Sequence, residues 1–569
     1  MKMINNLHQE ARPKIVMNLR HLVKSSAEAF GDKVLYKYKV GKNYVDMTYS
    51  EFYESMNKIG AALTKVGLND CGVAVTGTMH PYYICSYLAT VNGSGYIVPI
   101  DPDISDEQTV NFLKLAEVKV LFYTVSQRDK IVRIKNDLPE IKLFIELNAN
   151  GDPADGAITI QELMAVGEEE IKNGHTEYMA KPIDLEKMSA LLFTSGTTGT
   201  SKGVMLSQKN LTAATNASCL TMSYDYNNTF VSCLPPHHSY EITCGNLAIM
   251  NLGATILIND SLKSVMRNFA SFKPNALMLV PLFVETMHKK INDEVKKKNL
   301  TFAFNLLKIL NSCLLFFRID VRDKLFASVT GAFGGNLKSI VCGGAPVSAE
   351  IIKDFYSFGI TVLEGYGITE CSPLVAVNSP GKVKFRSVGT PVYGCSVKID
   401  NPDPEDGTGE ILVKGENVMM GYYRNPEATA EVFTEDGWFR TGDIGYMDEE
   451  NYIFITGRKK NVIILSNGKN VFPEELEEYI NAVPEILESV VLTRANETTS
   501  EQEICAVCVP NYEILGEEIS DEDAYKNVKS IIDDINKKLP SHKMIRRIEI
   551  RKEPFERTTS KKIKRFTVK

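Results

Sequence analysis

Short apolar runs alternate with helix-like stretches between residue 20 and about residue 180. The apolar runs have the length and the β-favouring composition of buried strands. They are Val73–Val75, Tyr96–Ile100, Val118–Val125 and Leu143–Ile145. This alternation predicts an α/β fold in which stacked βα units build a largely parallel sheet.

The same pattern resumes after residue 200. Four further strands are predicted, at Thr229–Leu234, Ala254–Ile258, Ala276–Val280 and Ser339–Cys342. They indicate a second α/β unit that follows the first along the chain.

A charged helical stretch at Lys289–Lys298 precedes an apolar one at Phe302–Phe317. Two interpretations of the apolar stretch are open. With lysines before it and Arg318, Arg322 and Lys324 after it, it could form a peripheral contact with a membrane surface. Alternatively its apolar side packs on the core, and we favour packing because the stretch is too short to span a bilayer and core helices are commoner.

Glycines punctuate short strands from Val388 to Tyr452, which predicts a small antiparallel β subdomain. Beyond it, short β runs mix with helices that begin at Pro473 and near Ser520. We therefore predict an N-terminal domain over residues 1–457, with two α/β subdomains to about 387 and the β subdomain over about 388–457. A small mobile α+β domain is predicted over residues 458–569.

Composition narrows the class of protein. Of the 569 residues 44% are hydrophobic and 24% charged, as in ordinary soluble globular proteins, and the length predicts several subdomains. The 64 basic and 71 acidic side chains give a net charge of −7, so nucleic acid is not an expected partner. Because Met1–Asn6 lacks the apolar core of a secretory signal and no apolar run is long enough to cross a bilayer, the cytoplasm is the expected location.

The cysteines fit the same location. All eleven are scattered, and most lie inside apolar runs, where cysteine acts as a small hydrophobic residue. Cys505 and Cys508 form a C-x-x-C, but they lie in an apolar strand pattern and no second pair completes a zinc site. We interpret them as structural.

Hydroxyls, glycines and one lysine crowd into Thr194–Val204, directly after the apolar run Ala190–Leu192. The pattern predicts a strand that leads into an exposed loop, and such a loop suits phosphate, since glycine lets the backbone approach oxyanions and Lys202 supplies the opposite charge. An ordinary flexible surface turn is an equal alternative for this stretch alone. It is not a P-loop, because Ser201 and Gly203 break that pattern.

Further motifs follow the loop at long spacing. They are Leu234–Glu241 (LPPHHSYE), Gly343–Pro346 (GGAP), Gly365–Glu370 (GYGITE), Gly437–Asp443 (GWFRTGD), Gly457–Arg458 and Arg557–Arg565 (RTTSKKIKR). In this order and spacing the chain resembles the adenylate-forming (AMP-binding) superfamily from about residue 20 to its end. The residues of LPPHHSYE and of GYGITE with the Cys-Ser-Pro that follows it are most similar to the long-chain fatty-acyl-CoA synthetase and acyl-carrier-protein ligase branch.

The resemblance implies a reaction in two steps. ATP and a carboxylate give an acyl adenylate and pyrophosphate, and a thiol then takes the acyl group. No general base is required, since a carboxylate is already ionised at neutral pH. The implied cofactors are ATP, Mg²⁺ and CoA, or the phosphopantetheine of a carrier protein in place of CoA.

The resemblance also assigns roles to individual residues. The Thr194 to Lys202 loop would hold the β- and γ-phosphates, and Glu370 would bind Mg²⁺ with Thr194 nearby. Tyr366 would stack on adenine, with close backbone approach at the glycines beside it. Asp443 would accept both ribose hydroxyls, reinforced by Arg458. The implied nucleotide site therefore comprises Thr194, Ser195, Gly196, Thr197, Thr198, Gly199, Lys202, Gly343, Gly344, Ala345, Gly365, Tyr366, Gly367, Thr369, Asp443, Arg458, Lys460, Gly468 and Lys562.

Two histidines occupy the position that the family places beside the acyl carboxylate. His238 matches the family's aromatic or histidine residue, with a satisfied core histidine as the alternative. His237 replaces the usual apolar residue, so which of the two imidazoles faces the site stays open. Glu241 matches an acid of the fatty-acyl branch and is given no role.

Lys562 aligns with the catalytic lysine that the family uses to bridge the carboxylate and the α-phosphate. The preceding residue is usually glycine and here is Lys561, which costs flexibility and adds charge, so adenylation could be slower or Lys561 could help to hold pyrophosphate. In the family the C-terminal domain rotates about a hinge, here Lys460, and Gly468 would then admit a pantetheine arm.

We therefore expect a ligase that forms a fatty-acyl thioester, with CoA as the first candidate acceptor and acyl carrier protein as the second. A basic surplus over residues 543–569 suits either acceptor. A free-standing peptide-synthetase-type enzyme is a less favoured alternative, and a nucleotide-binding protein with weak ligase activity is the alternative from another class. The fatty acid, the thiol acceptor and a peripheral membrane contact are the expected partners.

Overall fold

The apolar runs fold into strands and the stretches between them into helices. The computed structural model describes residues 15–148, 152–154, 156–194, 201–261, 263–465, 470–495, 502–516, 518–557 and 563–568. The chain divides into two units, residues 1–396 with 413–439 and residues 397–412 with 440–569. None of the described helices is both long and apolar enough to cross a bilayer.

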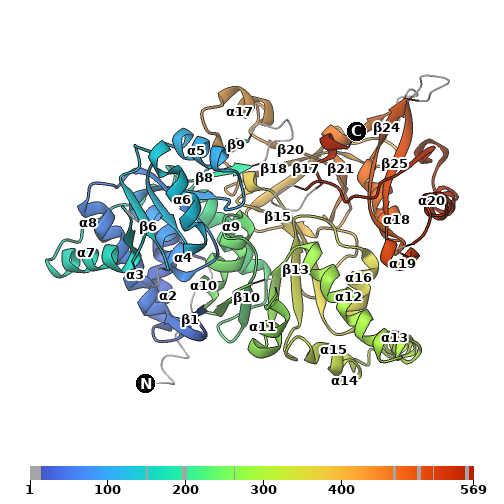
Figure 1. Ribbon diagram of the computed structural model, residues 1–569, viewed down its shortest axis with the longest axis horizontal. Helices are drawn as coiled ribbons and strands as arrows, with labels where there is room; N and C mark the ends of the chain where they lie inside the picture. The colour runs from blue at the N-terminus through green and yellow to red at the C-terminus, as the bar shows by residue number, and fades with distance from the viewer. Residues whose placement is uncertain are drawn as a thin grey trace. The chain divides into compact units, whose positions relative to one another are not determined.

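The first predicted strands form an eight-stranded sheet in the first unit (Figure 1). Its strands, in spatial order, are β19 (Gly421–Tyr422), β9 (Lys202–Ser207), β8 (Met188–Thr194), β4 (Gly95–Ile100), β3 (Cys71–Thr76), β5 (Val118–Tyr123), β6 (Leu143–Glu146) and β7 (Ile158–Thr159). Neighbours from β8 to β7 run parallel, as predicted. The hairpin partner β9 runs antiparallel to β8, and β19 runs antiparallel to β9.

Capping residues in the sequence start the helices of this region. Thr48 and Thr159 each form a capping box with the glutamate three residues later, which fixes the first turns of α3 (Tyr49–Lys65) and α7 (Ile160–Lys172). Ser207 forms a capping box with Asn210 at the start of α9 (Gln208–Thr221). The other helices here are α2 (Leu19–Phe30), α4 (Pro81–Ala89), α5 (Asp106–Leu115), α6 (Arg128–Ile134) and α8 (Glu177–Ala180).

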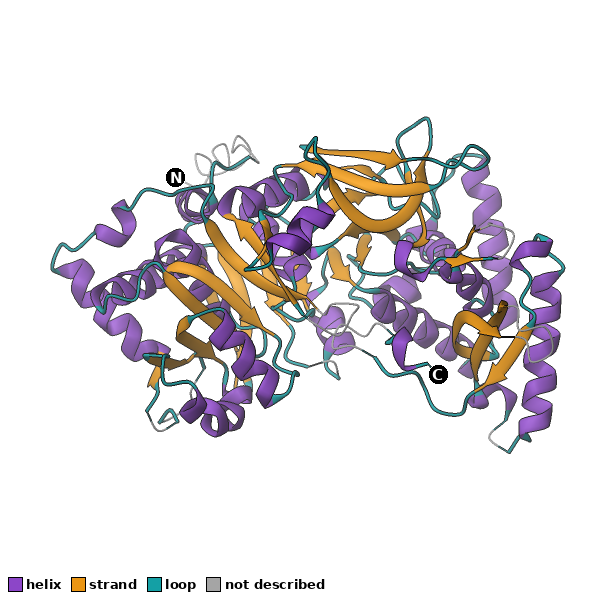
Figure 2. Cartoon of the chain, turned by 90° about the horizontal axis from the view of Figure 1, so that it is seen from above, coloured by secondary structure: helices purple, strands orange, loops and turns teal. Residues whose placement is uncertain are grey.

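The second group of strands forms a nine-stranded sheet, also in the first unit. Its strands, in spatial order, are β16 (Thr390–Pro391), β15 (Leu374–Val377), β14 (Thr361–Gly367), β13 (Ser339–Gly343), β12 (Ala276–Leu279), β10 (Thr229–Ser232), β11 (Thr255–Ile258), β1 (Val34–Val40) and β2 (Asn43–Thr48). The strands from β14 to β1 run parallel, and both edges are antiparallel. Figure 2 shows helices on both sides of the sheet strands.

The hairpin β1–β2 is absent from the predicted strands, and it joins the second sheet although its residues lie in the first predicted unit. Strand β1 pairs with β11, and Leu35 and Tyr36 are fully buried. The Tyr36 hydroxyl donates to the side-chain oxygen of Asn246 at 2.9 Å. The N-terminal chain therefore crosses to the other sheet before the first βα unit begins.

Helices cover the second sheet around an aromatic core that includes Phe269, Phe326, Phe355 and Phe358. They are α10 (Ala248–Leu252), α11 (Val265–Phe272), α12 (Pro281–Lys297), α13 (Thr301–Phe316), α14 (Arg322–Leu325), α15 (Ala327–Gly331) and α16 (Ala349–Ser357); α17 (Pro426–Val432) follows β19. Phe304 and Leu307 of α13 pack against this core, so the predicted packing is confirmed for that side of the helix.

Most of the second unit is built from two sheets. One has the order β17 (Cys395–Asp400), β18 (Gly409–Gly415), β20 (Phe439–Met447) and β21 (Ile453–Arg458), and the other has β24 (Ile486–Ala495), β25 (Gln502–Pro510) and β26 (Arg547–Ile550). The remaining elements are β22 (Ile463–Ile464), β23 (Asn470–Val471), α18 (Pro473–Asn481), α19 (Tyr512–Leu515) and α20 (Asp521–Asn536). The predicted helix starts at Pro473 and near Ser520 are confirmed, and Ser520 is the N-cap of α20.

The C-x-x-C pair is structural, as predicted. Cys505 and Cys508 are buried in β25 and belong to two different apolar clusters. Residues three apart on a strand point to opposite faces, so these two thiols do not converge on one ligand.

Candidate active site

Strands β8 and β9 hold the two ends of the predicted phosphate loop together. Thr194 and Lys202 are paired across the hairpin, and the Thr194 hydroxyl donates to the Lys202 carbonyl at 3.4 Å. Residues Ser195, Gly196, Thr197, Thr198 and Gly199 lie outside the described residues. The hairpin thus places one hydroxyl and one ammonium at the base of the loop.

Tyr422 links Lys202 to Glu370. The Tyr422 hydroxyl donates to Oε1 of Glu370 at 3.0 Å, and the Lys202 ammonium lies 4.7 Å from the centre of the Tyr422 ring. Burial, and then the charge of Glu370, raise the pKa of the phenol well above its usual range, so Tyr422 stays a hydrogen-bond donor. The structure therefore brings together the predicted metal ligand and the predicted phosphate lysine.

Tyr422 is a site residue that sequence reasoning missed. It lies on β19, which adds to the free edge of β9 with Tyr422 opposite Val204. The Met419 amide donates to the Glu370 carbonyl at 2.8 Å, which fixes the same segment against the Glu370 turn. The two residues Gly421–Tyr422 carry no strand pattern of their own, so only the tertiary pairing reveals their place.

The predicted adenine site lies at the ends of β13 and β14. Gly343 and Gly365 are paired across these parallel strands, and Tyr366 is buried in β14. Gly344 has a φ of 93°, and a Cβ added there would find only Val280 nearby, at 3.8 Å, so the surface above it is open. At Gly367 there is no room for a side chain, since an added Cβ would lie 2.2 Å from the Pro373 carbonyl oxygen.

The two histidines lie next to each other and beside Asp101. The His237 and His238 rings are 4.1 Å apart, and Nε2 of His237 lies 3.6 Å from Oδ2 of Asp101. Burial, and then the neighbouring His238, lower the pKa of His237 to about 3, so this imidazole is neutral at physiological pH. Neither ring nitrogen of His237 has a hydrogen-bond partner among the described residues. Asp101, which follows β4, was missed because nothing in the sequence connects it with the histidines.

Two contacts join the histidine segment to the rest of the site. The Tyr240 hydroxyl donates to the Val341 carbonyl in β13 at 3.0 Å, and the Thr243 hydroxyl donates to the Ser372 carbonyl at 3.0 Å. Ser372 follows directly on the short turn Thr369–Cys371, which carries Thr369 and Glu370. The histidines, the glycine pair and the metal ligand are therefore parts of one connected region.

Glu241 is fully buried behind the histidines. Its Oε1 accepts hydrogen bonds from Ser232 and from Asn246, whereas Oε2 has no partner among the described residues. Burial raises the pKa of Glu241 to about 8, so the carboxyl is mostly protonated at neutral pH. It supports the segment Ser232–Asn246 as a neutral hydrogen-bonding group.

The predicted ribose residues are brought together within the second unit. Asp443 and Arg458 are paired across β20 and β21, and Nε of Arg458 lies 2.8 Å from Oδ1 of Asp443. The Asp443 amide donates to the Thr441 hydroxyl, which donates in turn to the Ile411 carbonyl at 2.8 Å. Asp443 is buried, and a carboxylate is an acceptor-only group with two oxygens, as the predicted contact with a diol requires. Lys460 lies in the turn that follows β21.

Two ion pairs secure the chain on either side of the predicted catalytic lysine. Arg557 pairs with Glu488, and Arg565 pairs with Glu477, whose carboxylate also accepts from the Val491 amide at 2.6 Å. Lys561, Lys562 and Gly468 lie outside the described residues.

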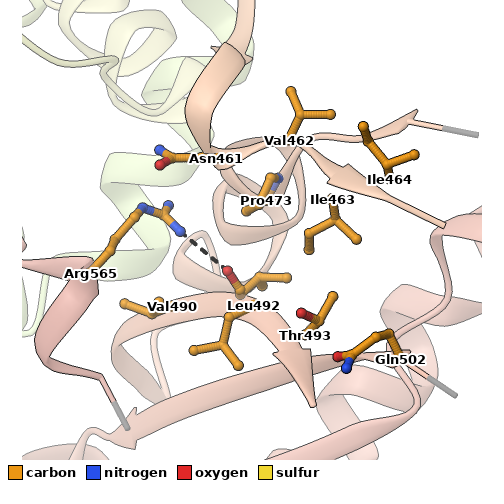
Figure 3. A pocket seen from close by; sticks show the side chains of 11 residues that line it. Asn461, Val462, Ile463, Ile464, Pro473, Val490, Leu492, Thr493, Gln502 and Arg565 are labelled. Carbon is orange, nitrogen blue, oxygen red and sulfur yellow. Dashed lines mark hydrogen bonds between the residues drawn. The ribbon is translucent and has the colours of Figure 1, made fainter. Parts of the chain in front are cut away.

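Arg565 also lines a pocket of about 340 Å³ in the second unit (Figure 3). The guanidinium donates to the Val491 carbonyl at 3.2 Å, and apolar side chains such as Ile463 and Leu492 form much of the wall. None of the predicted site residues lines this pocket.

The predicted metal ligands are oxygen donors, which would suit a magnesium ion that is held partly by a nucleotide. Among the described residues no group of three His, Cys, Asp or Glu side chains converges as a ready-made metal site. Mg²⁺ is commonly held by one or two carboxylates together with substrate phosphates and water. The predicted ligands, Glu370 and the Thr194 hydroxyl, would supply oxygen atoms of that kind.

Solved structures with the same fold include adenylate-forming enzymes. The ATP-bound MatB structure from Rhodopseudomonas palustris has a TM-score of 0.74 at 24% identity, covering 97% of this chain and 98% of that one. A Mycobacterium tuberculosis fatty acyl CoA synthetase has a TM-score of 0.66 at 21% identity, with 96% of each chain covered.

Two relatives of similar sequence are both named long-chain-fatty-acid–CoA ligases. The long-chain-fatty-acid–CoA ligase FadD15 of Mycobacterium bovis is 30% identical over 480 residues, 81% of this chain and 77% of the relative. The long-chain-fatty-acid–CoA ligase ACSBG2 of Xenopus laevis is 29% identical over 84% of this chain and 67% of the relative. Residues 460–569 match the C-terminal domain of AMP-binding enzymes, and residues 23–423 match the model of the AMP-binding enzyme family itself, so this chain belongs to that family.

Proposed function

We propose that this chain is an ATP-dependent ligase that joins a long-chain fatty acid to CoA through an acyl adenylate. The observation that carries the proposal is the connected set of Lys202, Tyr422 and Glu370 at the base of the phosphate loop. Such a set would offer a bound triphosphate both a cation and a carboxylate able to bind a metal. The names of the relatives at about 30% identity supply the acid and the acceptor.

In the first half-reaction a carboxylate oxygen attacks the α-phosphorus of ATP, the bond from that phosphorus to the β-phosphate oxygen breaks, and pyrophosphate leaves. Both reactants are anionic, so fixed positive charge lowers the barrier. Lys202 would neutralise the departing pyrophosphate, and Lys562 would bridge the carboxylate and the α-phosphate. Magnesium, when bound at Glu370 and Thr194, would supply further charge neutralisation.

The histidine pair would receive the carboxylate of the fatty acid. His237 is held neutral by burial, so it adds no fixed charge next to the acid. An imidazole N–H donated to the carboxylate would orient it without the strong attraction that would hold it in the ground state. His238, in ring contact with His237, is the proposed donor.

In the second half-reaction the thiolate sulfur of the acceptor attacks the acyl carbon, the acyl–phosphate bond breaks and AMP leaves. The nucleotide would stay anchored through its adenine above Gly344 and its ribose at Asp443. We propose that the C-terminal unit, counted from residue 458, turns about Lys460 between the two half-reactions, and that Gly468 then admits the pantetheine arm.

CoA and acyl carrier protein are separated by a direct assay. Pyrophosphate release over a panel of fatty acids tests the first half-reaction, and thioester formation with purified CoA or with holo carrier protein tests the second. We expect long-chain acids to release pyrophosphate and CoA to accept the acyl group. Turnover with carrier protein alone would replace CoA by the second candidate, and no release with any acid, alongside ATP binding, would favour a nucleotide-binding protein.

The role of Lys562 has its own test. Lys562→Ala should abolish pyrophosphate release and leave thioester formation from supplied acyl adenylate intact. Lys564→Ala removes a lysine of the same segment and should retain both activities. Normal pyrophosphate release by Lys562→Ala would show that the assignment of this lysine is wrong.

A further inference from the structure

One side of α13 exposes a continuous run of large apolar side chains, which we call the α13 strip. Its members are Phe302, Leu306, Ile309, Leu310, Cys313, Phe316 and Phe317. Their spacing of three and four residues places them along one side of a helix. Phe302 and Phe316 are each 82% exposed and Ile309 is 62% exposed, far above what a core-packing helix shows.

The other side of α13 is firmly packed, so the strip cannot turn inward. Phe304 and Leu307 contact the core of the first unit, and Asn311 is fully buried. The Lys308 ammonium lies 2.7 Å from Oδ1 of Asp354 on α16, and the Asn311 amide donates to the Ser357 carbonyl. In Figure 1 α12 and α13 form a helical pair at the border of the first unit.

From residue 295 to residue 319 every charged residue is basic, with Glu294 and Asp320 directly outside this range. From residue 299 to residue 319 the sequence contains no Asp or Glu. Lys296 and Lys297 lie before the helix and Arg318 after it, all three exposed. In the part of the chain that the structure describes, none of these three has a carboxylate within ion-pair distance, so both ends of the strip present available cations. An anionic surface complements this arrangement.

A lipid surface fits the strip better than a protein partner does. Apart from the weak thiol of Cys313, the strip offers no hydrogen-bonding side chain, whereas protein interfaces combine apolar contacts with many hydrogen bonds. Aromatic residues stand at both ends, with lysine and arginine outside them, as in helices that lie in a bilayer interface. The helix has 16 residues, about 24 Å, which suits an orientation parallel to the surface.

We propose that the α13 strip docks the protein on a bilayer containing anionic phospholipids, with α13 in the plane of the interface. The proposal deepens the proposed function, since a long-chain acid partitions into the same bilayer and would be collected there. Docking itself requires no turnover. The strip and the cations act together, because apolar insertion and attraction to anionic headgroups both contribute to interfacial binding.

Sedimentation with phospholipid vesicles tests the proposal on the full-length protein. We expect binding to vesicles of phosphatidylcholine mixed with phosphatidylglycerol, and weaker binding to phosphatidylcholine alone. Replacing Phe302, Leu306 and Ile309 by Gln keeps good helix formers at exposed positions and should weaken vesicle affinity by about tenfold or more. The Lys296→Gln, Lys297→Gln, Arg318→Gln variant should remove the preference for anionic vesicles.

A matched control replaces three exposed apolar residues of other helices, Leu115, Val132 and Val166, by Gln. This control should bind vesicles like the parent chain. Equal binding by the strip variant and the parent, or no binding by the parent, would overturn the proposal. A parent that self-associates in sedimentation velocity, with the strip variant monomeric and no vesicle binding, would assign the strip to a second copy of the chain instead.

The test is separate from that of the ligase. Pyrophosphate release with a water-soluble medium-chain acid should be the same for the strip variant and the parent. Vesicle binding without any ligase activity would refute the proposed function and keep the docking surface, whereas ligase activity without vesicle binding would do the reverse.

Discussion

Replacing Tyr422 by Phe removes one atom from the connected set at the phosphate loop. The hydroxyl donates to Glu370 at 3.0 Å, while the ring that contacts Lys202 is retained. A hydrogen bond to a charged group contributes about 1.5–3 kcal/mol. Glu370 is half-buried, so water partly replaces the lost donor and the lower end, about 1.5 kcal/mol, is the appropriate figure.

If that hydrogen bond aligns Glu370 for the metal, its loss falls on adenylation. We expect kcat/KM for pyrophosphate release to fall about tenfold, since about 1.4 kcal/mol corresponds to a factor of ten. The Mg²⁺ concentration for half-maximal rate should rise, because the carboxylate is no longer held in one orientation. Thioester formation from supplied acyl adenylate should change little.

Tyr423→Phe is the matched control, as the same atom is removed from the residue directly after β19, whose side chain packs against the apolar cluster that contains Leu121 and Leu191. Both variants are first compared with the parent by thermal unfolding. The reasoning is refuted if Tyr422→Phe stays within twofold of the control in both rate and Mg²⁺ dependence.

Three further predictions test groups elsewhere in the site. Folding raises the pKa of Glu241 from its ordinary value of 4.5 to about 8. The unfolded chain therefore loses this proton first, and the free energy of unfolding falls between about pH 4.5 and about pH 8. In urea unfolding, Glu241→Gln should remove this pH dependence and raise the free energy of unfolding at pH 7 by roughly 3 kcal/mol. Asp443→Asn weakens the contact with Arg458 and should raise KM for ATP about tenfold in a nucleotide titration, whereas an unchanged KM would contradict the ribose role. Arg565→Ala leaves the buried Glu477 without its ion-pair partner and should lower the free energy of unfolding by about 2 kcal/mol. This loss is smaller than that for a fully buried ion pair, because Arg565 is partly exposed. Arg565→Lys should recover part of the lost stability.

Much of the fold follows from local patterns. The runs at Val73–Val75 and Tyr96–Ile100 became parallel strands because buried parallel strands are apolar on both faces and stand out in a sequence. Strand β1 was missed although Tyr36 and Tyr38 alternate with lysines, since a single short alternation competes with many similar stretches. Its place in the second sheet depends on pairing with β11, more than two hundred residues away, which no local pattern encodes.

The candidate site shows the same division. Local sequence motifs were sufficient to predict three site residues, Thr194, Lys202 and Glu370, because each lies in a motif with a characteristic residue pattern. Tyr422 and Asp101 could not be predicted, since each contributes through one atom placed by tertiary pairing. The neutral state of His237 was equally hidden, because it results from burial and from a second imidazole rather than from residue type. The domain boundary near residue 457 and the catalytic role of Lys562 stay predictions.

The late pairing of β19 with β9 has a consequence for synthesis of the chain. Roughly two hundred residues separate the two strands, so at about 5–20 residues per second the ribosome needs roughly 10–40 s to produce β19 after β9. During that interval β9 is a bare sheet edge next to a completed hairpin, which is a template for pairing with other nascent chains. Translation pauses between these segments should therefore promote aggregation, and a chaperone that shields strand edges should relieve it.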